Sequence, residues 1–85
     1  MQGTSWDDLR VFRAVAEAGS FAAAGQVMGL HETTIARHVR RLERQAGQIL
    51  WRGPEAGVTD EGAMLLRHVA AMADHAAQAQ AELHG

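Results

Sequence analysis

The stretch Ser20–Glu43, SFAAAGQVMGLHETTIARHVRRLE, divides into two helical patterns separated by a glycine. The first pattern, Phe21–Met28, is short and apolar, and the serine just before it is a typical N-cap. Gly25 lies mid-helix, where glycine costs about 1 kcal/mol relative to alanine, so we expect it to face the following helix closely. Gly29 can adopt the positive φ of a tight turn, and we expect Leu30 to be buried. The stretch predicts a helix-turn-helix.

The second helix of this motif is predicted from Glu32 or Thr33 to Ala46, with His31 or Thr33 as its cap and Gly47 ending it. Apolar residues at three- and four-residue spacing form one seam: Ile35, Val39, Leu42 and Ala46. The opposite face is polar and basic: Thr33, Ala36, Arg37, Arg40, Arg41 and Arg44. Such a face is suited to contact DNA.

Another helix is predicted before the motif, over about Trp6–Ala18. Ser5 is its expected N-cap, and Asp7 and Asp8 lie in the first turn, where carboxylates complement the helix dipole. Gly19 then ends it. One face is apolar: Trp6, Leu9, Phe12, Val15 and Ala16.

A short β-wing is predicted after the motif. Its strand-forming residues are Ile49, Leu50 and Trp51, its turn residues are Gly53, Pro54 and Gly57, and Val58 begins the return. We expect the Trp51 ring to lie in the core.

The rest of the chain is predicted to be one long helix, capped by Thr59 and reaching about Leu83. Its apolar and small residues follow the 4, 3, 4, 3, 4 spacing of a heptad seam: Leu65, Val69, Met72, Ala76, Ala79 and Leu83. This seam predicts a homodimer formed through the C-terminal helix. We expect residues 1–58 to form the first domain and residues 59–85 a dimerisation helix.

Composition restricts the classes of protein. The 85 residues include no cysteine, and no segment approaches the ~20 apolar residues of a membrane span, so we expect a cytoplasmic protein without a membrane anchor. The net charge of −2 is unevenly distributed. Between Arg37 and Arg52 there are five arginines and one acid, Glu43, whereas between Asp60 and Glu82 there are four acids and one arginine. A local positive patch can attract a polyanion despite the net charge.

Taken in order, these features resemble the N-terminal domain of LysR-type transcriptional regulators. The motifs that carry the resemblance are Gly19-Ser20-Phe21, Arg40-Arg41-Leu42-Glu43, Leu50-Trp51 and Thr59-Asp60-Glu61-Gly62, together with the first-helix spacing. The resemblance implies a mainly α, winged helix-turn-helix fold with three helices and a short wing, followed by a long linker helix that pairs two subunits. It implies double-stranded DNA as the partner, a pseudo-palindromic site and a role in transcription. Most family members continue into an effector-binding domain, so we expect these 85 residues to be either an excised DNA-binding domain or a free-standing one.

The predicted DNA-binding residues lie on the motif and the wing: Ser20, Glu32, Thr33, Thr34, Ala36, Arg37, Arg40, Arg41 and Arg52. Arg37 is the best candidate for base reading, since it lies early in the second helix and a guanidinium pairs bidentately with guanine. Arg40, Arg41 and Arg44 lie further along the helix and are expected to contact phosphates or to remain solvated. Glu32 could accept a bond from cytosine N4, although a structural role near the helix dipole is favoured.

Other roles stay open. Thr33 and Thr34 could donate to DNA or cap the helix, and Ala36 could meet a thymine methyl group. Arg52 could contact the DNA backbone or minor groove, or remain solvated. Where the family usually has Ser-Gln-Pro, this chain has His31-Glu32-Thr33, so the sequence of its DNA site cannot be taken from relatives.

Enzymatic activity is not expected. His68 and His75 are seven residues apart, but no third ligand completes a metal site, and no nucleophile with a base or glycine-rich phosphate loop is present. We therefore expect no metal or cofactor. The competing interpretation is a winged-helix module for protein–protein interaction that lacks meaningful affinity for DNA.

Overall fold

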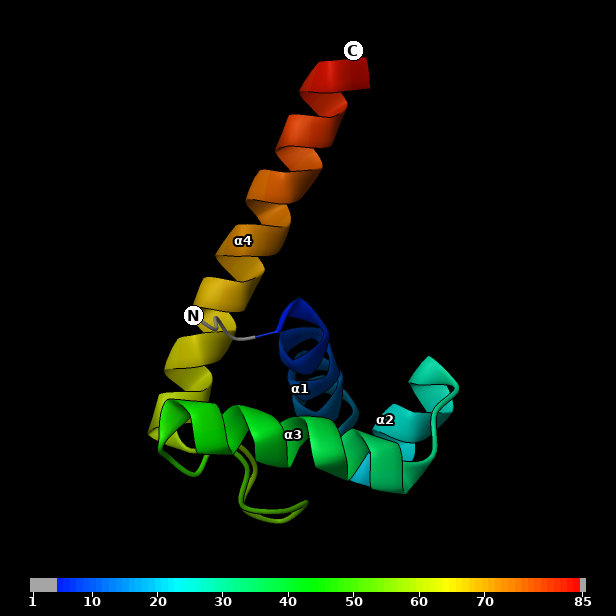
Figure 1. Cartoon of the computed structure of the whole chain (residues 1–85), viewed down its shortest axis with the longest axis vertical. Coiled ribbons are helices and arrows are strands. Elements are labelled where there is room, and N and C mark those ends of the chain that lie inside the picture. Colours follow the sequence, from blue (N-terminus) through cyan, green and yellow to red (C-terminus); the bar gives the residue numbers. More distant parts are fainter. Residues whose placement is uncertain (1–4, 85) are drawn as a thin grey trace.

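The computed structural model describes residues 5–84, except for the side chains of Ala76 and His84. Within that range the chain forms four helices, shown in Figure 1: α1 (Trp6–Ala18), α2 (Phe21–Met28), α3 (Glu32–Ala46) and α4 (Asp60–His84). α1 contacts all three other helices, and α2 also contacts α3. The predicted helices and their bounds are confirmed, and the fold is mainly helical.

The helix ends follow the predicted capping pattern in part. The Ser20 hydroxyl accepts a 3.0 Å bond from the backbone N–H of Ala23, and the Thr59 hydroxyl accepts one of 3.0 Å from that of Gly62. Ser5 and His31 occupy N-cap positions, but their side chains make no capping bond. The first three helices each end at a glycine in the left-handed conformation, and at Gly29, with φ of 71°, this turns the chain from α2 into α3.

Two apolar clusters pack around α1. The first consists of Leu9, Phe12, Leu42, Leu50 and Val69. The second consists of Val11, Val15, Ala24, Ile35 and Val39. Trp51 is half-buried and packs against both clusters, and its ring centroid lies 6.3 Å from that of Phe21, in agreement with its predicted core position.

Four expectations about the core are corrected. Trp6 is 44% exposed because it lies at the free end of α1, and Leu30 is 38% exposed because it lies in the turn itself. Ala46, the last residue of α3, is exposed as well. For Gly25 the correction is partial: a Cβ there would lie 2.5 Å from the carbonyl oxygen of Leu30 in the turn and 3.6 Å from the backbone nitrogen of Glu32, the first residue of α3.

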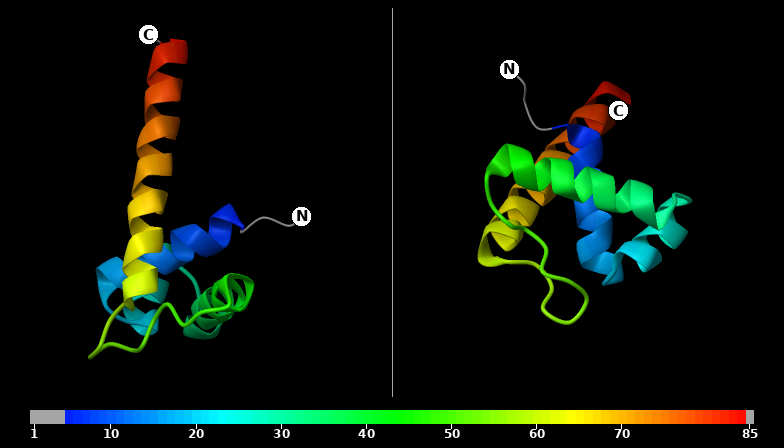
Figure 2. Two further views of the ribbon diagram at one scale, coloured as in Figure 1. Left: turned by 90° about the vertical axis from the view of Figure 1, so that its left-hand side faces the viewer. Right: turned by 60° about the horizontal axis from the view of Figure 1, so that its bottom comes forward.

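The predicted wing is reduced to one antiparallel bridge between Trp51 and Val58. Beside it the backbone N–H of Arg52 donates to the Gly57 carbonyl at 2.9 Å, and the Gly57 N–H donates to the Gly53 carbonyl at 2.8 Å. Among the described residues, no strand is longer than this single bridge, because the chain turns back within a few residues and Pro54 lacks an N–H donor. The resulting loop, residues 51–58, lies beside α3 (Figure 2).

The first turns of α4 are part of the core, and the rest of the helix projects from the molecule (Figures 1 and 2). Val69 is only 1% exposed, and Leu65 packs partly buried against the same cluster. The predicted dimer seam is therefore divided: these two residues are used within the monomer, whereas Met72, Ala79 and Leu83 are exposed. Ala76, also predicted in the seam, has a side chain outside the described residues. None of the described helices is both long enough and apolar enough to cross a membrane.

Candidate nucleic-acid interface

α3 has one face in the core and the opposite face open to solvent. Its buried residues are Ile35, Val39 and Leu42, three of the four in the predicted seam. The exposed residues of the opposite face are Thr33, Arg37, Arg40 and Arg44. Because these residues recur at three- and four-residue spacing, their side chains project from the same side of the helix.

This exposed face carries uncompensated positive charge. In the described part of the chain, the ion pairs involve Arg10, Arg13, His38 and Arg41. No carboxylate there lies within ion-pair distance of Arg37, Arg40, Arg44 or Arg52. Free guanidinium groups on one helix face form a site to which a polyanion can bind.

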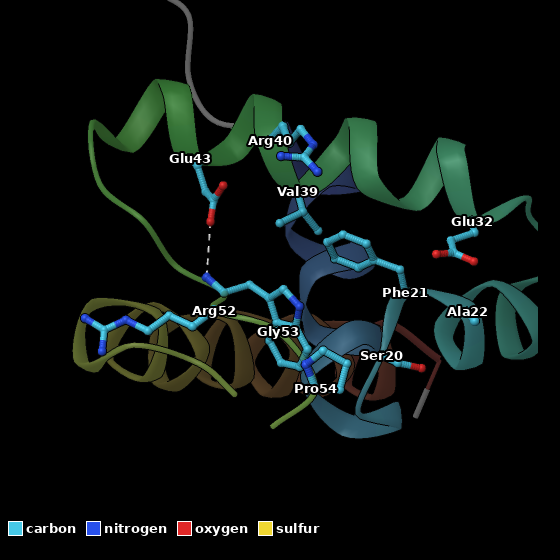
Figure 3. A pocket seen from close by; sticks show the side chains of 11 residues that line it. Ser20, Phe21, Ala22, Glu32, Val39, Arg40, Glu43, Arg52, Gly53 and Pro54 are labelled. Atoms are coloured by element: carbon cyan, nitrogen blue, oxygen red, sulfur yellow. Dashed lines mark hydrogen bonds between the residues drawn. The ribbon is translucent and has the colours of Figure 1, made fainter. Parts of the chain in front are cut away.

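Two shallow hollows lie along this face. One, of about 560 Å³, extends along α3 and is lined by Phe21, Glu32, Thr33, Ala36, Arg37, Arg40 and Arg44. The other, of about 490 Å³, lies between the start of α2, the middle of α3 and the loop 51–58 (Figure 3). Its lining includes Ser20, Arg40 and Arg52. In Figure 3 the Glu32 carboxylate points toward Phe21, whereas the Arg52 side chain extends away from Phe21. Because Arg40 and Glu32 line both hollows, the two hollows form one continuous surface.

Asp8 joins α1 to the side of α3. Its carboxylate is 0% exposed, and it accepts bonds from Arg41 Nε at 2.8 Å, Arg41 Nη2 at 2.6 Å and His38 Nδ1 at 2.6 Å. The proton on His38 is assigned to Nδ1, because a carboxylate can only accept. The Arg41 guanidinium holds the pKa of Asp8 below its ordinary value; burial opposes this effect and the His38 bond supports it. Asp8 in turn raises the pKa of Arg41.

Glu43 joins α3 to the loop that carries Arg52. Its Oε2 accepts bonds from the backbone N–H groups of Leu50 at 2.9 Å and Trp51 at 3.1 Å. The loop is also bound to the start of α4, since the Thr59 hydroxyl donates to the Ile49 carbonyl at 2.8 Å. The Glu43 carboxylate and the Thr59 hydroxyl thus help to hold the loop in position, together with a 3.0 Å bond from the Thr59 N–H to the Leu50 carbonyl.

The structure brings together most of the residues predicted to contact DNA. Those that line the two hollows are Ser20, Glu32, Thr33, Ala36, Arg37, Arg40 and Arg52. Thr34 is half-buried and lines neither of them. Arg41 is also elsewhere: its guanidinium is turned toward α1 and bonded to Asp8, so it does not share the surface of Arg37 and Arg40.

Arg44, also predicted to contact phosphate or remain solvated, lines the hollow along α3. Sequence reasoning missed the roles of Asp8 and Glu43. Asp8 was interpreted only as a first-turn acid that complements the helix dipole. Its spacing carried a further signal, because Asp8 precedes the buried residues Val11 and Val15 by three and seven positions and therefore shares their face. Glu43 had no comparable signal, since its partners are backbone groups of a loop.

Comparisons with known proteins agree with this architecture. Residues 6–63 match the family described as bacterial regulatory helix-turn-helix protein, lysR family. The mau operon transcriptional activator of Paracoccus denitrificans is 47% identical over 47 residues, which cover 55% of this chain and 17% of that protein.

Two solved structures have the same fold. Full-length LTTR LysG from Corynebacterium glutamicum superposes with a TM-score of 0.89 at 24% identity, over 98% of this chain and 29% of that one. ArgP from Mycobacterium tuberculosis superposes with a TM-score of 0.81 at 32% identity, over 96% of this chain and 30% of that one. The chain thus spans less than a third of each of these three proteins.

Proposed function

This chain belongs to the LysR family of bacterial regulatory helix-turn-helix proteins, and we propose that it binds double-stranded DNA through α3 and regulates transcription. The observation that supports this most directly is the row of unpaired arginines on the exposed face of α3. That face runs along α3, and the side chains on its early turns project away from the core, as base reading requires.

We assign different roles to the residues of this surface. Arg37 and Thr33 lie on the early turns of α3, and we assign them to base edges in the major groove, with Ala36 beside them against a thymine methyl. Arg40 and Arg44 lie further along and bind phosphates, which positions the helix without reading sequence. Arg52 contacts the flanking backbone.

Two other residues fit subsidiary roles. Ser20 caps α2 through the N–H of Ala23, and the N–H groups of Phe21 and Ala22, which line the same hollow, bind a phosphate. Glu32 accepts a hydrogen bond from cytosine N4, because a carboxylate that faced a phosphate would be repelled. Thr34 and Arg41 have no DNA contact in this proposal.

The protein acts as a homodimer in this proposal. The projecting part of α4 exposes Met72, Ala79 and Leu83, which are spaced to form one side of a helix pair. Residues 1–58 then make up the DNA-binding domain, and residues 59–85 the helix that both completes its core and pairs the subunits. Two recognition helices related by a twofold axis would read a pseudo-palindrome with half-sites about 34 Å apart, or a multiple of that. The place of action is the cytoplasm, and no catalytic step is involved.

Selection of bound duplexes from a random pool tests this function. We expect one enriched pseudo-palindromic sequence, and binding whose logarithm falls linearly with the logarithm of salt concentration. Arg37→Ala should relax base preference at one position of each half-site, at a cost on the order of 1–3 kcal/mol.

The phosphate contacts have their own comparison. Arg40→Ala should weaken binding to all sequences and lower the salt slope by about 1 for each subunit, because one phosphate contact is lost. Arg13→Ala is the matched control, since Arg13 is an exposed arginine on α1 that is paired with Glu17. Absence of any retardation of random duplex at low salt, with the chain folded, would contradict DNA binding and favour the protein-interaction module.

A further inference from the structure

We propose that Asp8 is a positioning residue for DNA reading: by holding His38 and Arg41, it sets the rotation of α3 about its own axis and removes Arg41 from the DNA-binding surface. This inference rests on the proposed function, because it concerns how α3 presents its outer face to DNA.

The geometry supports a direct mechanical link. His38 and Arg41 follow Arg37 and Arg40 by one residue each, which is about 100° around a helix of 3.6 residues per turn. Two residues of the same flank are therefore bonded to one buried carboxylate by three short hydrogen bonds. A rotation of α3 would carry both donors away from Asp8 and leave a fully buried charge without partners, which is strongly unfavourable.

The opposite flank of α3 carries a second attachment. Glu43 is about 200° around the helix from Arg41, and it is bonded to the loop through Leu50 and Trp51. The apolar seam alone would tolerate some rotation, because apolar contacts are not directional. Hydrogen bonds on both flanks are directional, so together they restrict which side chains face outward.

The pairing also determines what Arg41 can do. Its Nε and Nη2 both donate to Asp8, and the positive charge of the guanidinium lies against a full negative charge. A paired arginine releases no counterion from DNA, so Arg41 should not contribute to the salt dependence of binding. Arg40, its neighbour in sequence, should contribute fully.

The experiment compares Asp8→Asn, Arg41→Gln and the control Asp7→Asn in the 85-residue chain. Asp7 lies in the same helical turn and carries the same charge, but it is exposed, its ion pair is with Arg10 at 3.3 Å, and it acts on Arg41 through charge alone, without a hydrogen bond. For each variant, the dissociation constant is measured for the duplex enriched from a random pool and for a random-sequence duplex of equal length. The ratio of the random-duplex constant to the enriched-duplex constant measures discrimination, and it does not depend on the fraction of chain that is folded, so mere destabilisation leaves it unchanged.

We expect Asp8→Asn and Arg41→Gln to reduce this ratio about tenfold, the order of one lost base contact, while Asp7→Asn keeps it within about twofold. We also expect Arg41→Gln to keep the salt slope of the parent chain. Ratios unchanged in both variants, or a slope lowered by about 1 per subunit in Arg41→Gln, would overturn the inference while leaving DNA binding intact. If the parent chain prefers no duplex, the proposed function itself fails. Should Asp8→Asn not fold, Arg41→Gln decides, because the Arg41 side chain is 43% exposed and can be replaced without opening a cavity.

Discussion

Glu43 on α3 accepts a 2.9 Å hydrogen bond from the backbone N–H of Leu50, and this bond ties α3 to the segment that leads into the loop 51–58. The same carboxylate oxygen accepts from Trp51, whose side chain packs against both apolar clusters. One acid in a basic segment thus serves the structure and leaves Arg40 and Arg44 unpaired among the described residues.

Glu43→Ala should lower the free energy of unfolding by about 1.5–3 kcal/mol, because two part-buried N–H groups lose a charged acceptor. Urea denaturation followed by circular dichroism measures the change. The control is Glu55→Ala, at an exposed position of the adjacent turn. Equal stabilities for the two variants would show that water replaces the carboxylate without cost.

The stability of the fold should depend on pH through Asp8. Its pKa in the folded state is lowered from the ordinary value of 3.8, so the ionised form stabilises the fold at pH values above 3.8. This stabilisation is lost as the pH falls below 3.8 and through the folded-state pKa. The difference in unfolding free energy between the parent chain and Asp8→Asn should therefore be largest near neutral pH and shrink in acid. Urea titrations at several pH values measure it, and a difference that grows on acidification would contradict the assignment.

The divided seam of α4 predicts different outcomes for two glutamate substitutions. Val69→Glu should unfold the chain, because it places a charge in the cluster formed with Leu9 and Phe12. Met72→Glu should leave the helical content unchanged and yield a monomer in sedimentation, because Met72 is exposed beyond that cluster. Ala81→Glu, on the outer side of the heptad, is the control and should remain dimeric. A folded dimer with Met72→Glu would place the pairing surface elsewhere.

Gly62→Ala should destabilise the protein by about 1–3 kcal/mol, even though alanine favours helices. A Cβ at this position would overlap the carbonyl oxygen of Leu50 and lie 3.1 Å from Cζ of Phe12, so α4 would have to move away from the core. Thermal unfolding provides the measurement. A variant more stable than the parent would mean that the space exists and helix propensity decides.

Much of the architecture could be predicted from local sequence signals. Glycines and capping residues mark where the helices begin and end, and the Ile35, Val39 and Leu42 spacing identifies the buried face of α3. These signals are local, since a helix cap or an apolar stripe involves residues within a few positions of one another. The early part of the proposed DNA-binding surface, from Glu32 to Arg37, could be predicted for the same reason.

The remaining features could not be predicted without knowing which helices and loops pack against one another. Arg40 and Arg41 are equivalent by composition, yet one is free and the other is bonded to Asp8, 33 positions away in the sequence. The wing was overestimated, because strand propensity at Ile49 does not tell how many residues find a partner across the turn.

The sequence by itself determined the four helices, their ends and the basic face of α3, because each of these depends on contacts between near neighbours in the chain. Three features depend instead on tertiary packing: which arginines stay unpaired, which residues of the α4 heptad are buried in the core, and the pairing that keeps Asp8 charged although it is buried. The physical reason is the same in each case: periodicity shows which side of a helix is apolar or charged, but burial and pairing depend on the element packed against that side.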